Sequence, residues 1–166
     1  MRKETMVQQT IGTPEELFRF QLRSATTMEN HSLEALAELK GAAKSKEVKD
    51  LFSHHSDETK EQIANLEQVF TLCEFGSSTA PSPATTGIKN QASSLIERVA
   101  PKLYDQVALM SALGNEHFEI SMYQGLIAAA EALQVPDAVA LLQANLDQEV
   151  HTSEELHRTR REILNV

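Results

Sequence analysis

The chain has 166 residues, which is enough for one domain with a substantial core. Its formal charge of −9 argues against binding to nucleic acid or to an anionic membrane, because both need a basic surface. A single cysteine, Cys73, excludes an internal disulfide. No apolar run has the length that secretion or a membrane span requires, so we expect a cytoplasmic protein. Abundant alanine, leucine and glutamate, with little glycine and no tryptophan, favour an all-α fold.

Two long helices are expected in the first half of the chain. Thr13 can cap the first helix, with Pro14 at its first position and Glu16 closing a capping box, and this helix should reach about Ala43. Ser45 can cap the second, which should end near Cys73. Apolar side chains recur at helical spacing along both segments: Phe18, Leu22, Ala25, Leu33 and Leu36 in the first, and Leu51, Phe52, Leu66 and Val69 in the second.

The second half of the chain repeats this plan. Residues 74–88 are rich in Ser, Thr, Pro and Gly and are expected to form a long crossover loop. A short amphipathic helix over about 89–99 should follow. Pro101 should then open a third long helix reaching about Leu133, and Pro136 a fourth.

Two helical hairpins joined by a long crossover are typical of a ferritin-like four-helix bundle. The expected fold is therefore an all-α bundle of this kind with a short fifth helix. We expect residues 13–164 to form the domain and residues 1–12 to be a flexible N-terminal extension.

Glutamates occupy the apolar stripes of all four long helices, where glutamate is least expected. Burying unpaired carboxylates costs several kcal/mol or more unless they are paired or bind a metal. Glu29 and Glu58 are 29 residues apart, and Glu119 and Glu149 are 30 apart, so each hairpin can bring its carboxylates to one level. The candidate metal ligands are Glu29, Glu58, Glu116, Glu119 and Glu149, together with His55, which lies one turn before Glu58.

These residues could also have structural roles that involve no metal. Most glutamates on helices are solvated, and a lone histidine such as His55 is more often a hydrogen-bonded core residue. His117 lies at the edge of its stripe, and His151 points away from Glu149, so we discount His151 as a ligand. Gln62 and Tyr123 are candidates for orienting the carboxylates.

A site rich in hard oxygen ligands favours iron or manganese, or even Mg and Ca, over copper or zinc. Two such ions would lie about 3.5–4 Å apart, bridged by carboxylates. The expected bridging residues are Glu58 and Glu149. Glu29, Glu116 and Glu119 would then be terminal or semi-bridging ligands, with His55 completing the shell.

Three motifs resemble the YciE/YciF family of bacterial ferritin-like, stress-associated proteins. The first is a histidine followed after two residues by Glu-Thr and then by Leu-Glu-Gln-Val-Phe, present as His55, Glu58, Thr59 and 66–70. The second is Glu-His-aromatic-Glu-Ile with a trailing tyrosine, present as 116–120 and Tyr123. The third is an acidic pair in the fourth helix, here Gln148 and Glu149. The family's first-helix glutamate corresponds to Glu29, and the resemblance covers about residues 15–160.

The resemblance implies a dimeric, five-helix ferritin-like domain with a di-iron or related metal centre and a stress-linked role. Two features depart from the pattern. The general ferritin-like signature places a histidine three residues after a glutamate on two helices. Here Glu61 follows Glu58 at that distance, and Thr152 follows Glu149. Gln148 also removes one charge from the acidic pair.

A second interpretation belongs to another class. The domain could be a non-catalytic structural or interaction module in which the core glutamates are vestigial and held protonated or hydrogen-bonded. Metal content of the purified protein would separate the two. In both cases we expect a homodimer that binds neither nucleic acid nor membrane.

Overall fold

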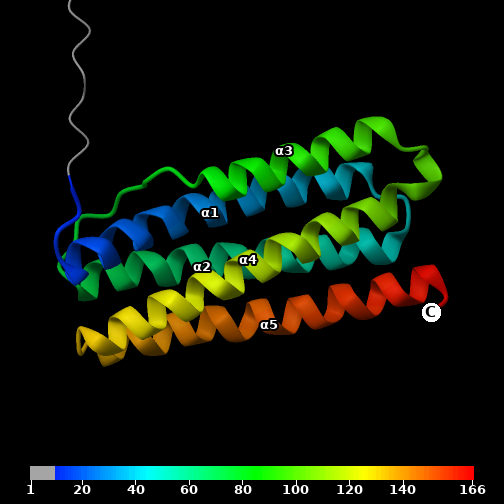
Figure 1. Cartoon of the computed structure of the whole chain (residues 1–166). Coiled ribbons are helices and arrows are strands. Elements are labelled where there is room, and N and C mark those ends of the chain that lie inside the picture. Colours follow the sequence, from blue (N-terminus) through cyan, green and yellow to red (C-terminus); the bar gives the residue numbers. More distant parts are fainter. Residues whose placement is uncertain (1–9) are drawn as a thin grey trace, which may run out of the picture.

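The computed structural model describes residues 10–166, and all regular secondary structure in this part of the chain is helical, with no strand. The four long helices are α1 (Pro14–Ala42), α2 (Lys46–Leu72), α4 (Tyr104–Ala132) and α5 (Pro136–Leu164). A shorter helix, α3 (Pro83–Arg98), and a 3₁₀ turn, η1 (Pro101–Leu103), complete the chain (Figure 1). The all-α prediction and the four long helices are confirmed. None of these helices combines the length and the apolar character needed to cross a membrane.

Local chemistry explains where the first hairpin begins and turns. The Thr13 hydroxyl accepts from the Glu16 backbone N–H at 3.1 Å, and a Glu16 carboxylate oxygen accepts from the Thr13 N–H at 3.2 Å, which completes the predicted capping box. Ser45 caps α2 by accepting from the Val48 N–H at 3.3 Å. These two caps fix the register at which α1 and α2 face each other.

The bundle pairs α1 with α2 and α4 with α5, and the two hairpins pack through α1 against α4 and α2 against α5. Helix α3 lies along the outside of α1 and α4 (Figure 1). Two hydrophobic clusters fill the two ends of the bundle. One contains Phe18, Leu22, Met28, Leu66, Phe70, Tyr123, Leu126 and Leu142, and the other contains Leu36, Val48, Phe52, Ala108, Leu109, Ala112 and Leu156.

A polar layer separates these two clusters at mid-bundle. Along every long helix, buried polar side chains occupy the turns between the residues of one cluster and those of the other. They are Glu29 and Ser32 in α1, His55, Thr59 and Gln62 in α2, Glu116 and Glu119 in α4, and Asn145, Glu149, Thr152 and Ser153 in α5. The four long helices therefore place their buried polar side chains at one level of the bundle, between two apolar clusters.

Two predicted boundaries were wrong. The loop expected over residues 74–88 ends early, because α3 begins at Pro83 rather than near residue 89. Pro83 occupies the first helical position, where a backbone N–H would have no acceptor within the helix. Proline is therefore tolerated there, and in this segment it marks the start of a helix rather than part of a loop. Pro101 opens the 3₁₀ turn, and the third long helix begins only at Tyr104. Of the expected N-terminal extension, residues 1–9 lie outside the described residues.

The crossover loop is held against α1 by several hydrogen bonds. The Arg23 guanidinium donates to the Thr79 carbonyl at 2.8 and 3.2 Å, and the Ser24 hydroxyl donates to the Pro81 carbonyl at 3.1 Å. The Ala80 N–H donates to the Arg23 carbonyl at 3.1 Å. These contacts set the position at which α3 starts and so place α3 over the polar layer.

Asp105 joins the two hairpins at the other end of the bundle, and removing it should weaken the fold. Its carboxylate accepts from the backbone N–H groups of Lys44 and Ser45 at 2.6 and 3.0 Å, so it ties the α1–α2 turn to the start of α4. We expect Asp105→Ala to lower the free energy of unfolding by about 1–3 kcal/mol, because two backbone donors lose their partner. Urea denaturation measures the change. The matched variant Asp57→Ala, at an exposed carboxylate paired only with Lys60, should change stability little; equal effects would contradict the assigned role.

Candidate metal centre

Four carboxyl groups and one imidazole meet in the polar layer. Glu29 comes from α1, His55 from α2, Glu116 and Glu119 from α4, and Glu149 from α5; the four glutamates are fully buried and His55 is 1% exposed. Glu116 and Glu119 are three residues apart on α4, so both project toward the bundle axis. The helix spacing that predicted an inward face for these residues is confirmed for all five.

One group of residues is close enough to bind the same ion. His55, Glu116, Glu119 and Glu149 each offer one ligand atom, and these atoms all lie within 4.8 Å of one another. We call these four residues the inner cluster. Within it, His55 Nε2 is 3.3 Å from Glu116 Oε1. Three helices thus contribute to a single cluster of three carboxylates and one imidazole.

Glu29 borders the inner cluster and is held by a hydrogen-bond network. The Tyr123 hydroxyl donates to Glu29 Oε1, and the same hydroxyl accepts from Asn145 Nδ2 at 3.0 Å. Asn145 also donates to the Gln62 carbonyl at 3.1 Å and accepts from Asn65 at 2.7 Å. The other Glu29 oxygen, Oε2, is buried without a hydrogen-bond partner among the described residues. The network leaves this oxygen available as a ligand.

Glu58 lies at the edge of the layer on the side formed by α2 and α5. Its side chain is 13% exposed, one oxygen accepts from the Thr152 hydroxyl at 3.0 Å, and the other is 3.5 Å from His54 Nε2. The Thr152 partner lies one turn after Glu149 on α5, and the charge of Glu58 adds to the rise in the pKa of Glu149. The structure does not bring Glu58 into the inner cluster, and its bridging role stays a prediction.

Several site residues were not singled out from the sequence. Asn145 is fully buried and holds Tyr123, and its position four residues before Glu149 and three after Leu142 was the available signal. Ser32 and Asn115 form a second pair near the layer, with Asn115 donating to Ser32 at 3.2 Å. Tyr123 was predicted near the centre and lies there. His117 and His151 are exposed, in agreement with the low weight given to them.

Burial controls the electrostatics of the layer. It raises the pKa values of Glu29, Glu116 and Glu119 well above the ordinary range, and the neighbouring charge of Glu149 adds to each rise. Burial likewise raises the pKa of Glu149 to about 7 and lowers the pKa of His55 to about 4. Without a cation, the layer therefore reduces its own repulsion by holding protons on carboxyl groups and by keeping the imidazole neutral. The close His55–Glu116 contact is then a contact between neutral groups.

The residues fit a bound divalent cation. Among the described residues, the buried ligand atoms without a hydrogen-bond partner include both oxygens of Glu116, Glu119 and Glu149, both ring nitrogens of His55, Glu29 Oε2 and Gln62 Oε1. Such orphaned atoms are rare in native cores, and each costs about 1–3 kcal/mol or more. A cation would satisfy several of them at once. Carboxylate oxygens with one imidazole suit iron or manganese.

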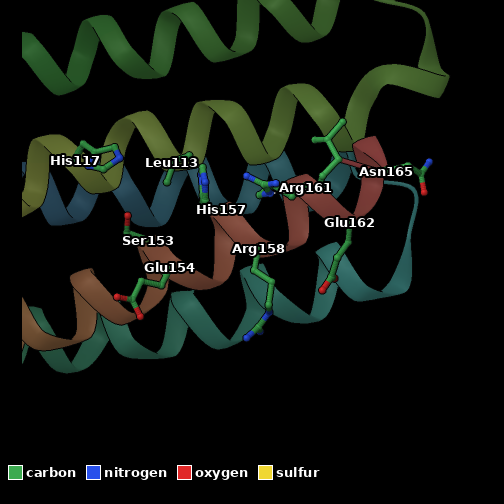
Figure 2. Close-up of a pocket in the computed structure, with 10 residues that line it drawn as sticks. Leu113, His117, Ser153, Glu154, His157, Arg158, Arg161, Glu162 and Asn165 are labelled. Atoms are coloured by element: carbon green, nitrogen blue, oxygen red, sulfur yellow. Dashed lines mark hydrogen bonds between the residues drawn. The ribbon is translucent and has the colours of Figure 1, made fainter.

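A large surface groove lies away from this centre. It has a volume of about 960 Å³ and runs between α4 and α5 near the C-terminal end of α5. Figure 2 shows Leu113 and His117 of α4 facing the α5 residues His157 and Arg161. No inner-cluster residue lines it, so it is not the mouth of the candidate centre.

Comparison with known proteins agrees with the fold and with the motifs. Residues 13–166 match the family described as "Domain of unknown function (DUF892)". The protein YciF of Escherichia coli K12 is 29% identical over 142 residues, which cover 84% of this chain and 86% of that protein. The resemblance to the YciE/YciF family is thereby confirmed.

Solved structures show the same architecture. The crystal structure of the E. coli stress protein YciF has a TM-score of 0.89 at 27% identity, covering 93% of this chain and 99% of that one. The proposed structural protein YcfI from Rhodopseudomonas palustris has a TM-score of 0.85 at 29% identity, covering 94% and 98%. A protein from Xanthomonas campestris, at 21% identity and a TM-score of 0.75, covering 92% and 94%, shares the fold.

The protonated layer predicts how the stability of the chelated, metal-free protein depends on pH. Above about pH 6.5, unfolded glutamates are ionised and unfolded histidines are neutral, whereas the folded layer still holds protons on its raised carboxyls. The folded state then binds more protons than the unfolded state, so stability should fall from pH 6.5 to pH 8. The slope is about 1.4 kcal/mol per pH unit for each proton retained.

Below about pH 6.5, His55 contributes a slope of opposite sign. Its folded pKa of about 4 lies below its unfolded value, so its contribution is lost as pH falls. Urea unfolding in the presence of a chelator measures the dependence between pH 6.5 and pH 8. Glu149→Gln should flatten it, and a stability that rises over this interval would show that the layer is not protonated.

Proposed function

This chain belongs to the family described as Domain of unknown function (DUF892), and we propose that its polar layer binds a pair of iron or manganese ions. The observation that carries this proposal is the convergence of four buried side chains whose ligand atoms lie within 4.8 Å and lack hydrogen-bond partners. Burying such a group is unfavourable for a core that only packs, unless the carboxyl groups hold protons. A cation gives each of these atoms a partner and removes the repulsion among the carboxylates.

The proposed ligands divide into an inner and an outer set. His55, Glu116, Glu119 and Glu149 form the inner set because they are mutually in reach. Glu29, on the α1 side, and Glu58, on the α2–α5 side, flank it, and each has one oxygen tied by a neighbour, Tyr123 or Thr152. Five carboxylates and one imidazole match the ligand number of a carboxylate-rich di-metal site in a helical bundle.

A bound pair of iron or manganese ions would supply redox chemistry toward small oxidants or iron itself. The chain's own contribution is to exclude water and fix the ligands. The two hydrophobic clusters seal the layer from both ends of the bundle. Tyr123 and Asn145 orient Glu29, and Thr152 orients Glu58, in the way that outer partners hold metal ligands.

The biological setting follows from the relatives. E. coli YciF is a stress protein, and we extend a stress-linked role to this chain. We also propose that the protein acts in the cytoplasm as a homodimer.

The second candidate is a structural or interaction module. It is favoured by the raised pKa values of the buried carboxyls, because protonation lets the metal-free layer persist without a cation. In that case the layer would be a vestigial site. The two candidates differ in metal content and in the effect of metal on stability.

Metal analysis and thermal melting of the purified protein should separate them. We expect about two iron or manganese ions per chain after loading and a higher melting temperature than after chelation. Metal that binds only the folded state adds about 2.7 kcal/mol at a hundredfold excess over Kd. Glu58→Gln combined with Glu149→Gln should abolish most of this gain and should raise the stability of the metal-free protein at pH 8, because like charges are removed.

The matched control is Glu61→Gln combined with Glu154→Gln, which changes exposed glutamates on the same two helices. This control should bind metal and melt like the parent protein. If neither iron nor manganese binds the parent, and chelation leaves the melting temperature unchanged, the structural module is the better account.

A further inference from the structure

A narrow crevice beneath α3 leads to the proposed metal centre. It lies where α3 covers α1 and α4, and its innermost lining residue is Glu116, a member of the inner cluster. Its enclosed volume is about 20 Å³, room for about one water molecule. Cores seldom leave such a space unfilled. A void that ends on an unpartnered carboxylate is therefore a candidate passage.

The crevice continues to the protein surface along both edges of α3. On the α1 side it shares Ala35, Leu39, Lys89 and Ala92 with a groove of about 180 Å³. On the α4 side it shares Ile88, Ala92 and Ser111 with a groove of about 200 Å³. Ala35, Ala92 and Ser111 are the small side chains of this shared lining, so a larger residue at one of these positions would narrow the connection between the outside and Glu116.

The lining selects by charge as well as by size. Apart from Glu116, no acidic residue lines the crevice; its other polar side chains are His31, Ser32, Thr85, Ser111, Asn115 and, at the mouth, Lys89. Asn115 and Ser32 are bonded to each other at 3.2 Å beside the layer. At the mouth, the Lys89 ammonium is paired with the Glu34 carboxylate. An ion would have to shed its hydration shell to enter so narrow and largely apolar a space. Small uncharged molecules do not face this desolvation cost.

A candidate ligand faces solvent on the opposite side of the layer. Glu58 is partly exposed, and its carboxylate accepts from Thr152, one turn after Glu149 on α5. Its carboxylate is the solvent-facing member of the candidate ligands. A cation that approaches between α2 and α5 therefore meets a carboxylate ligand at the surface, whereas beneath α3 Glu116 lies behind the crevice.

Helix α3, which covers the crevice, has few buried contacts with the bundle. Its local opening would allow molecules to pass through so narrow a crevice. Only Thr85 and Ala92 of α3 are buried. Its polar attachments to α1 are the His31–Thr85 hydrogen bond at 2.9 Å, the Lys89–Glu34 ion pair and the bond from Ser93 to Glu38 at 2.9 Å. Elements with few buried apolar contacts open locally at low free energy.

We propose that the crevice beneath α3 is the access route by which small uncharged molecules reach the inner cluster, with Ala35, Ala92 and Ser111 as its size filter. The destination rests on the proposed metal function, whereas the route itself does not. The tests below therefore include one that needs no metal.

The first test detects dissolved oxygen in the metal-free protein by nuclear magnetic resonance. Dioxygen is paramagnetic and broadens the methyl signals of the spaces that it enters. Under oxygen pressure, the Ala112 and Leu36 methyls, which line the crevice, should broaden more than the buried methyls of Val69 and Leu142 at the other end of the bundle. Ala35→Leu should remove this excess broadening, whereas Ala37→Leu, the same change at an exposed site on α1, should not. Equal broadening at both ends, or no effect of Ala35→Leu, overturns the route.

The second test uses nitric oxide, an uncharged diatomic probe, on the ferrous-loaded protein. Stopped-flow absorbance measures its association rate, and the rate of Mn²⁺ uptake is measured in parallel. Ala35→Leu should slow nitric oxide by about tenfold or more, because passage then requires local opening of α3. Manganese uptake should not change. Slowing of both rates would mean that the variant distorts the whole site, and it would overturn the assignment.

A third variant keeps the proposal falsifiable if Ala35→Leu folds poorly. Ile88→Ala shortens a lining side chain on the α3 side and so widens the crevice, whereas Ala35→Leu fills it. It should increase the oxygen broadening of Ala112 and speed nitric oxide binding, and a decrease in either would contradict the route. If the parent protein binds no metal, the nuclear magnetic resonance result still decides the crevice while the proposed metal function fails separately.

Discussion

The whole structure depends on one unfavourable arrangement, the crowding of carboxyl groups in a desolvated layer. Burial and mutual repulsion raise the pKa values of Glu29, Glu116, Glu119 and Glu149. None of the inner-cluster oxygens has a hydrogen-bond partner among the described residues. The apolar residues on either side must hold this layer together against its own repulsion. Each fully buried leucine or phenylalanine contributes about 1.5–3 kcal/mol, and both ends of the bundle are filled with such side chains.

The position of the layer follows from helix geometry. Two antiparallel hairpins with short turns bring residues at equal distances from the turn to the same level. Asp105 and the Ser45 cap set that level at the α1–α2 turn, and the polar residues then fall between Phe52 and Leu66 in α2 and between Leu142 and Leu156 in α5. The site is thus built on rigid helices rather than on loops, and its ligands have little freedom to rearrange.

The sequence predicted this level well because helical spacing fixes which residues point inward. Apolar neighbours at helical spacing predict inward faces for Glu29, Glu116 and Glu149. Glu119 follows from its position one turn after Glu116, and His55 from its position one turn before Glu58. The start of α3 could not be read in the same way, since Pro83 and Thr85 are typical of loops as well as of first turns. Asn145 escaped notice because its role depends on Tyr123 and Gln62, which lie on other helices. Glu58 is predicted at the bundle centre but is partly exposed between α2 and α5. Helical spacing cannot distinguish a side chain that points to the bundle axis from one that points to the neighbouring helix.

The repulsion in the layer would also account for the proposed binding of metal without ligands from loops or cysteines. In the metal-free protein the repulsion is reduced by protons, so a cation competes with protons for the same oxygens. The free energy released when the cation replaces them is available as affinity, provided that the scaffold does not relax first. The two hydrophobic clusters prevent that relaxation, and the Tyr123–Glu29 and Thr152–Glu58 bonds hold the flanking carboxylates in place. The polar layer therefore lowers the stability of the metal-free fold but would raise its affinity for a cation. The burial that raises the carboxyl pKa values also excludes water, which would compete for the cation.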